Sequence, residues 1–218
     1  LKNILNGIKT LIGKKMKNKK PDWSYTNTAI DIIYNEFNEK AESSNLICIP
    51  TGGGKTMCMI QDAKWRFSMP MPQTIVVVAP RILLANQLCS EFFEQNLDGK
   101  HNLSIECLHV HSGETIYDST LKTDHIVRWQ NNVMQTGENR IIFTTYHSLH
   151  RVVESGILID TIYFDEAHNS VQKNFFPATD YFSQYAGRCY FFTATPKHSR
   201  TPEKAGMNHT KTYGNEIR

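Results

Sequence analysis

Short apolar runs separated by longer mixed stretches recur along the chain after residue 45. The runs cover residues 46–49, 74–79, 104–111, 140–144, 158–164 and 188–193. The run 74–79 is continuous and rich in β-branched side chains, which is typical of a strand covered on both faces. The pattern therefore predicts a sheet that is buried on its two sides.

The stretches between these runs have the composition of helices, at residues 29–37, 57–67, 81–95, 121–133 and 148–154. Strands that alternate with helices indicate an α/β fold with a mostly parallel, doubly wound sheet and helices on both faces. The polar segment 113–137 resembles an insertion that contains one of the helices. Ligands in such folds bind at the carboxyl ends of the strands.

Length and cysteine content narrow the class of protein. At 218 residues the chain is long enough for one large α/β domain and too short for two. No segment has the pattern of a membrane span or a signal peptide, so no membrane partner is expected. The five cysteines show no CxxC spacing, which indicates reduced thiols inside a cell, in cytoplasm or nucleus, and argues against a disulfide framework or a zinc site. The start at Leu1 suggests a segment of something longer.

The net charge of +3 is unevenly distributed, because residues 1–20 hold seven lysines and no acidic residue. The apolar residues of this tail fall at helical spacing, which predicts a basic amphipathic helix. A nucleic-acid-binding arm, a membrane-surface helix and a helix that packs on another part of the protein all fit. A solvated connector fits equally well.

A glycine-rich segment, PTGGGKT at residues 50–56, lies between the predicted strand 46–49 and the predicted helix 57–67. Three successive glycines let the backbone wrap around an anion, and the helix N-terminus adds its positive dipole end. Lys55 is then placed to reach the β- and γ-phosphates, and the Thr56 hydroxyl to bind Mg²⁺. The predicted nucleotide site therefore consists of Thr51, Gly52, Gly53, Gly54, Lys55 and Thr56.

One position departs from the usual phosphate-loop pattern, which has a small residue where this chain has Ile49. The alternative interpretation is a glycine-rich turn that binds nothing. A GGGKT sequence behind a buried strand makes that alternative the weaker one.

A second chemical motif, Asp165-Glu166-Ala167-His168, directly follows the apolar residues 161–164. A carboxylate at the tip of a buried strand is where phosphate-loop folds hold Mg²⁺, which assigns the metal to Asp165. Glu166 is placed to polarise a water for attack on the γ-phosphate. Alone, an acidic pair at a strand end carries little information; combined with the glycine-rich segment it predicts ATP hydrolysis.

Together these motifs resemble the first motor domain of superfamily 2 helicases and translocases. The resemblance is to the DEAH-containing branch that includes restriction-enzyme motor subunits and related repair helicases. Residues 50–56 resemble motif I, residues 79–87 motif Ia, residues 144–149 motif Ib, residues 165–168 motif II and residues 193–196 motif III. The resemblance implies a RecA-like domain over residues 21–210, with Lys55, Asp165, Glu166 and His168 as its catalytic residues.

The resemblance also implies contacts with the sugar-phosphate backbone of DNA or RNA, which it does not distinguish. The residues involved would be Pro80, Arg81, Gln87, Thr144, Thr145 and His147. Strand ends beside helix starts suit phosphate binding, although for Arg81 or Thr145 alone helix capping is the simpler interpretation. Thr193 and Thr195 would couple nucleotide state to nucleic acid through His168; a lone threonine pair would more often be ordinary sheet residues.

Two further features limit which properties of the family can be expected of this chain. Family members have a glutamine after an upstream aromatic residue that reads adenine, whereas Thr26 follows Tyr25 here. Either Tyr25 alone supports the base or adenine selectivity is relaxed. Residues 211–218 resemble the start of a linker to a second motor domain, which would supply an arginine to the γ-phosphate. We therefore expect the chain by itself to bind nucleotide weakly and to hydrolyse it near background.

Three functions remain in competition. The first is the ATP-binding half of a nucleic-acid-dependent ATPase. The second is a phosphate-loop kinase or nucleotide switch that uses Thr56 and Asp165 on Mg²⁺ without nucleic acid, against which the motif Ia, Ib and III resemblances speak. The third is an ATP- and nucleic-acid-binding module without catalysis, which the presence of Lys55 and Glu166 disfavours.

Overall fold

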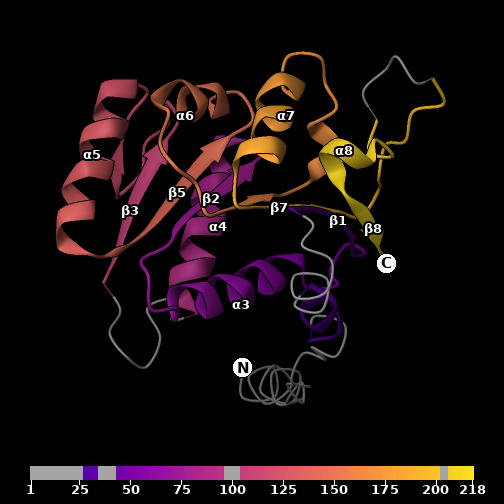
Figure 1. The fold of residues 1–218 in the computed structure, drawn as a ribbon, viewed down its shortest axis with the longest axis horizontal. Coiled ribbons are helices and arrows are strands. Elements are labelled where there is room, and N and C mark those ends of the chain that lie inside the picture. The colour runs from indigo at the N-terminus through magenta and orange to yellow at the C-terminus, as the bar shows by residue number, and fades with distance from the viewer. Residues whose placement is uncertain (1–26, 34–42, 96–103, 202–205) are drawn as a thin grey trace, which may run out of the picture.

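The structure is a computed structural model that describes residues 27–33, 43–95, 104–201 and 206–218. Its strands are β1 (Ser44–Cys48), β2 (Thr74–Ala79), β3 (Ile105–Val110), β4 (Asp118–Ser119), β5 (Asn139–Thr145), β6 (Thr161–Phe164), β7 (Arg188–Thr193) and β8 (Asn215–Ile217). They form one sheet in the order β4-β3-β5-β2-β6-β7-β1-β8 (Figure 1). All the strand pairs in it are parallel.

The helices lie on both faces of this sheet (Figure 1). They are α3 (Lys55–Phe67), α4 (Ile82–Glu94), α5 (Thr123–Thr136), α6 (Leu149–Ser155), α7 (Phe176–Tyr185) and α8 (Thr210–Tyr213), with a 3-10 turn, η2 (Ala167–Asn169). Residues 27–33 are also helical. The α3 and α4 helices cover one face, and α5, α6, α7 and α8 cover the other.

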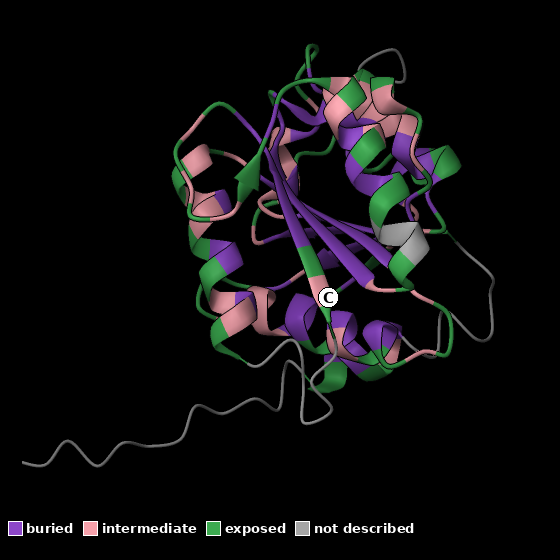
Figure 2. Ribbon diagram, turned by 90° about the vertical axis from the view of Figure 1, so that its left-hand side faces the viewer, coloured by how far each residue is buried: buried purple, intermediate pink, exposed green. Residues whose placement is uncertain are grey.

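Two apolar cores result, one on each face of the sheet. In β2, Ile75 and Val77 belong to the core beneath α3 and α4, whereas Val76 and Val78 belong to the opposite core. Successive strand side chains point to opposite faces, so a strand that feeds two cores is apolar over most of its length, as β2 is from Ile75 to Ala79. Figure 2 shows the result: the central strands are buried, and exposed residues lie mainly on the outer sides of the helices and at the edges of the sheet.

The predicted α/β fold with a doubly wound parallel sheet is confirmed. The predicted strands at 74–79 and 188–193 have the bounds of β2 and β7. The sequence did not predict β4, β8, α7 or α8. The segment 113–137 is partly integrated into the fold, because β4 pairs with β3 at the edge of the sheet.

The parallel arrangement brings the carboxyl ends of the strands to one edge of the sheet. The glycine-rich segment follows β1, Pro80 and Arg81 follow β2, His147 follows β5, and residues 165–168 follow β6. The predicted site residues that directly follow these strands therefore lie at this edge, whereas Gln87 lies further along α4.

The structure does not test several of the sequence predictions. The basic tail 1–20, Tyr25 and Thr26 lie outside the described residues. Residues 215–217 form β8, which pairs with β1; the assignment of 211–218 to a linker stays a prediction. Among the helices that the structure describes, none has both the length and the apolar character needed to cross a membrane.

A buried ion pair links α3 to the middle of the sheet. Nε of Arg66 donates to Asp62 at 2.7 Å, and both side chains are almost wholly buried. The Tyr163 hydroxyl donates to the same carboxylate oxygen at 2.5 Å, and Arg66 donates to the Tyr190 hydroxyl at 2.9 Å. Because Tyr163 and Tyr190 come from β6 and β7, this network fixes the α3 helix against the strands that flank the site.

We predict that Asp62→Ala lowers the free energy of unfolding by about 3 kcal/mol or more, because it removes the carboxylate partner of a buried guanidinium. Urea unfolding measures this. Arg66→Met combined with Asp62→Ala should cost less than the sum of the two single changes. The control is Glu154→Ala, which removes an exposed ion pair with Arg151 and should cost less than about 0.5 kcal/mol. Equal losses in Asp62→Ala and Glu154→Ala would contradict the structural role of the buried pair.

Candidate functional site

The glycine-rich segment forms an open turn in front of the α3 N-terminus. Gly52 and Gly54 have φ angles of 77° and 92°, in the left-handed region that glycine adopts at little cost. Gly54 is the N-cap of α3, and no side chain caps the helix there. The first N–H groups of α3 therefore point toward the open edge of the sheet, where an anion would satisfy them.

Ile49 explains why the middle glycine of the segment is required. A Cβ atom at Gly53 would lie 2.7 Å from Cγ2 of Ile49 and 3.0 Å from the carbonyl oxygen of Pro50. The N–H of Gly53 also donates to that carbonyl oxygen at 2.9 Å. The departure from the usual phosphate-loop pattern thus leaves the turn intact, because the isoleucine packs beneath a residue that has no side chain.

The structure brings the two chemical motifs together through an ion pair. Nζ of Lys55 lies 3.4 Å from Oε1 of Glu166, and the second carboxylate oxygen of Glu166 lies 3.4 Å from Nδ1 of His168. Lys55 is the first residue of α3, whereas Glu166 and His168 follow β6. The predicted catalytic lysine and glutamate therefore share one site, although they come from distant parts of the chain.

Asp165 lies just below this ion pair at the end of β6. Its backbone N–H donates to the carbonyl oxygen of Val78 at 2.9 Å, and its carbonyl oxygen accepts from the Tyr146 hydroxyl at 2.9 Å. These bonds hold the Asp165 backbone in place. Burial, together with the nearby negative charge of Glu166, raises the pKa of Asp165 to about 6. A cation bound by its carboxylate would compensate the cost of burying the negative charge.

Glu166 has an unusual backbone conformation. Its φ angle of 44° makes it the only residue other than glycine with positive φ in the described part of the chain. Such conformations cost about 1–3 kcal/mol and concentrate at functional sites. Here the left-handed turn directs the Glu166 side chain back toward Lys55.

Residues 165–168 and 193–196, for which coupling was predicted, are in direct contact. Nδ1 of His168 lies 3.1 Å from the Thr193 hydroxyl, and the same hydroxyl accepts from the backbone N–H of Thr195 at 3.2 Å. Burial lowers the pKa of His168, which favours the neutral ring. Thr193 makes the contact, whereas the side chain of Thr195 is exposed.

Three of the predicted nucleic-acid residues, Pro80, Arg81 and His147, line a hollow that also reaches the acidic motif. This hollow has a volume of about 440 Å³. Its lining residues are Pro80, Arg81, Leu84, His147, Glu166, His168, Asn169, Gln172, Asn174 and Phe175. The sequence did not indicate the contribution of residues 172–175, because they lie in a polar turn without a recognisable motif. His147 also packs edge-on against Phe175, with 4.7 Å between ring centroids.

The other predicted nucleic-acid residues make internal contacts. The Thr144 hydroxyl donates to the Val110 carbonyl oxygen at 2.8 Å and is fully buried. The Thr145 hydroxyl accepts from the N–H of Ser148 at 3.3 Å, next to the start of α6. Gln87 is exposed and donates to Glu91 at 2.7 Å. The hydroxyls of Thr144 and Thr145 therefore serve the fold, and any phosphate contact there would use the backbone.

A second, larger hollow of about 1200 Å³ lies beside the glycine-rich segment. It is lined by Thr51, Gly52 and Gly53 on one side and by Ala29 and Ile32 from the helix at 27–33 on the other. Its lining is mainly apolar next to the polar turn.

A fully parallel sheet with a glycine-rich loop after β1 and an acidic pair after β6 defines a RecA-like P-loop motor domain of superfamily 2. The chain belongs to the family described as Type III restriction enzyme, res subunit, whose model matches residues 19–198. No curated protein matches the chain.

Solved structures share this fold. The nuclease-deletion mutant of the Type ISP restriction-modification enzyme LlaGI, in complex with a DNA substrate mimic, has a TM-score of 0.72 and 20% identity. The DNA-bound Type ISP enzyme LlaBIII has a TM-score of 0.70 and 18% identity. The Hef helicase domain of Pyrococcus furiosus has a TM-score of 0.55 and 21% identity.

The matches differ in how much of each protein they cover. The alignment covers 88% of this chain for both Type ISP enzymes, but only 19% of LlaGI and 15% of LlaBIII. For Hef it covers 87% of this chain and 37% of the helicase domain. The chain therefore spans less than two fifths of the length of each of these three proteins.

We predict that Lys55→Ala abolishes nucleoside triphosphate binding measurable by calorimetry, because it removes the cation beside the glycine-rich turn. The matched control is Lys64→Ala, which removes a lysine from the last turn of the same helix and should leave affinity unchanged. Unchanged affinity in Lys55→Ala would place the triphosphate elsewhere.

Proposed function

We propose that the chain is the ATP-binding half of a nucleic-acid-dependent ATPase that moves along or unwinds DNA or RNA. The observation that carries the proposal is the 3.4 Å contact between Lys55 and Glu166 at the open carboxyl edge of the sheet. It joins a phosphate-binding cation to a candidate catalytic base within one site. The family membership supports the same function.

In this proposal the phosphates of ATP bind at the turn formed by residues 51–56. Gly52, Gly53 and Gly54 supply backbone N–H groups, and Lys55 contacts the β- and γ-phosphates. Thr56 and Asp165 are the candidate ligands for Mg²⁺, since a hydroxyl and a carboxylate are the oxygen donors that this ion takes in phosphate-loop proteins. When bound, Mg²⁺ would neutralise part of the triphosphate charge.

In the structure Lys55 and Glu166 form an ion pair. A triphosphate offers Lys55 a stronger negative partner, so its arrival would release the Glu166 carboxylate. Glu166 could then accept a hydrogen bond from the water that attacks the γ-phosphate. His168 would hold the other side of Glu166 and transmit its position to Thr193.

The hollow lined by Arg81 and His147 is the proposed contact for the nucleic-acid backbone. Arg81 is exposed at the N-cap of α4, where its charge and the helix dipole favour phosphate. Such contacts position a strand without reading its sequence. That the Type ISP structures contain DNA supports DNA as one candidate, and RNA remains the other.

The alternative without nucleic acid, a kinase or nucleotide switch, would use Thr56 and Asp165 in the same way. It leaves no role for the adjoining hollow that joins Arg81 and His147 to Glu166. Stimulation of ATP hydrolysis by nucleic acid separates the two proposals.

We predict that Glu166→Gln retains ATP binding but lowers turnover by about 10²-fold or more, because the amide preserves the shape and removes the base. Phosphate release should be measured in a protein that contains this chain together with a second motor domain. The chain alone should hydrolyse ATP near background, since no arginine from a second domain meets the γ-phosphate. Equal turnover by Glu166→Gln and the parent would assign the base to another residue.

We further predict that Arg81→Ala weakens binding to single-stranded DNA or RNA similarly for all sequences and reduces the salt slope by about 1. Fluorescence anisotropy at several salt concentrations measures both effects. Arg128→Ala, an exposed arginine on α5, is the matched control, and deletion of residues 1–20 isolates the contribution of the lysines in the tail. If affinity disappears with the tail while Arg81→Ala changes nothing, the hollow is not the binding site.

A further inference from the structure

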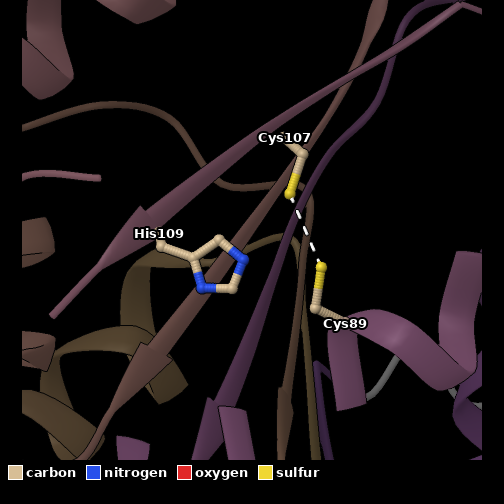
Figure 3. Close-up of side chains that lie close together, drawn as sticks. All are labelled: Cys89, Cys107 and His109. Atoms are coloured by element: carbon tan, nitrogen blue, oxygen red, sulfur yellow. Dashed lines mark hydrogen bonds between the residues drawn. The ribbon is translucent and has the colours of Figure 1, made fainter. Parts of the chain in front are cut away.

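A cluster of two cysteines and one histidine lies between α4 and the sheet, away from the nucleotide site. Cys89 comes from α4, and Cys107 and His109 come from alternate positions of β3, so their side chains share one face of the strand. Figure 3 shows the two sulfur atoms facing each other with the His109 ring beside them. The sulfurs are 3.9 Å apart, and the candidate ligand atoms all lie within 4.8 Å of one another.

His109 has an unusual environment for a buried side chain. Its ring stacks between Tyr117 and Phe143, with centroid distances of 5.7 Å and 5.6 Å. Its Nδ1 lies 2.9 Å from Nε2 of His111, but its own Nε2 is buried and has no hydrogen-bond partner among the described residues. A buried polar atom without a hydrogen-bond partner lowers stability by about 1–3 kcal/mol, and a ligand bound to this nitrogen would remove that cost.

We propose that Cys89, Cys107 and His109 form a binding site for a soft divalent cation, with Zn²⁺ as the ion that fits best. Two thiolates and one imidazole are ligands that zinc prefers in proteins. Two sulfurs bound to a tetrahedral zinc at about 2.3 Å are separated by about 3.8 Å. The observed separation of 3.9 Å already matches this value.

A hollow of about 400 Å³ lies beside the buried cluster and is lined by Cys89 and His109 together with Glu114 and Tyr117. In the proposal a cation enters through this hollow, and water or an oxygen atom of Glu114 or Tyr117 completes the tetrahedral shell.

The protons of the cluster can be accounted for. Because the thiolate is the form that binds a metal, Cys89 and Cys107 would each release their thiol proton to solvent when the cation binds.

The histidine pair must also rearrange. The N–H of Gly113 approaches Nδ1 of His111 at 3.2 Å, which places the His111 proton on Nε2 and the His109 proton on its own Nε2. When His109 binds the cation through Nε2, that proton is lost, Nδ1 of His109 takes the proton of His111, and Nδ1 of His111 regains one from solvent. His111 then accepts from His109, the outer-shell arrangement usual for a metal-bound histidine, at the cost of the Gly113 contact.

A cation bound at this cluster would link two elements of the fold. It would join α4, which begins beside Arg81, to β3 near the edge of the sheet. This position is separate from the nucleotide site, so the inference does not depend on the proposed ATPase function.

The test is zinc titration of the reduced 218-residue chain with a competing chelator, followed by cobalt substitution. We expect one zinc ion per chain and a cobalt complex that shows sulfur-to-metal charge-transfer absorption. Cys89→Ser, Cys107→Ser and His109→Gln should each weaken zinc binding by more than about 100-fold, because outer-shell changes alone cost about 10- to 100-fold. His111→Ala should fall within that outer-shell range.

The matched control is Cys58→Ser, which changes a fully buried cysteine of α3 outside the cluster and should retain the zinc affinity of the parent. Zinc should also raise the melting temperature of the parent but not of the ligand variants. Should the variants fail to fold, alkylation of the parent chain under partial denaturation gives an independent measurement: zinc should protect Cys89 and Cys107 but not Cys58. Retained affinity in Cys89→Ser and Cys107→Ser, an absence of thiolate absorption, or equal alkylation with and without zinc would overturn the proposal.

Discussion

The parallel register of β1, β7, β6 and β2 is the constraint on which the candidate site depends. Parallel pairing places the carboxyl ends of these strands side by side, so residues that follow different strands meet at one edge. Lys55 after β1 and Glu166 after β6 approach within 3.4 Å for this reason. The buried contacts of Asp62 and Arg66 with Tyr163 and Tyr190 hold α3 against the same strands.

The two proposed binding regions are physically continuous. Glu166 contacts Lys55 on the nucleotide side and lines the hollow that contains Arg81 and His147. His168 contacts both Glu166 and Thr193. A shift of the Glu166 carboxylate would therefore change its contact with His168, which reaches Thr193 on β7, and would change the wall of the hollow. These contacts give a local route by which nucleotide state and nucleic-acid binding could influence each other.

The sequence predicted the fold where one physical signal was dominant. The run that became β2 is buried at every position and apolar at all but Thr74, because it feeds two cores. By contrast, α7 has few strong helix formers, and only the spacing of buried Thr179, Phe182 and Ser183 marks it. The two residues of β4 are exposed and have no hydrophobic pattern. The motifs predicted which residues meet at the edge, whereas the hollow wall at 172–175 depends on tertiary packing that no local pattern encodes.

Burial of the sheet on both faces also bears on how far sequences with this fold can diverge. Every side chain of β2 is buried, and from Ile75 to Ala79 a polar replacement would carry a desolvation cost. In that part of the strand the best tolerated exchanges are among apolar residues of similar volume. Chains with only 18–21% identity to this one can keep the same strand framework under that restriction. The helices and loops around the framework, whose outer sides are exposed, are then the parts of the fold with the most freedom to vary.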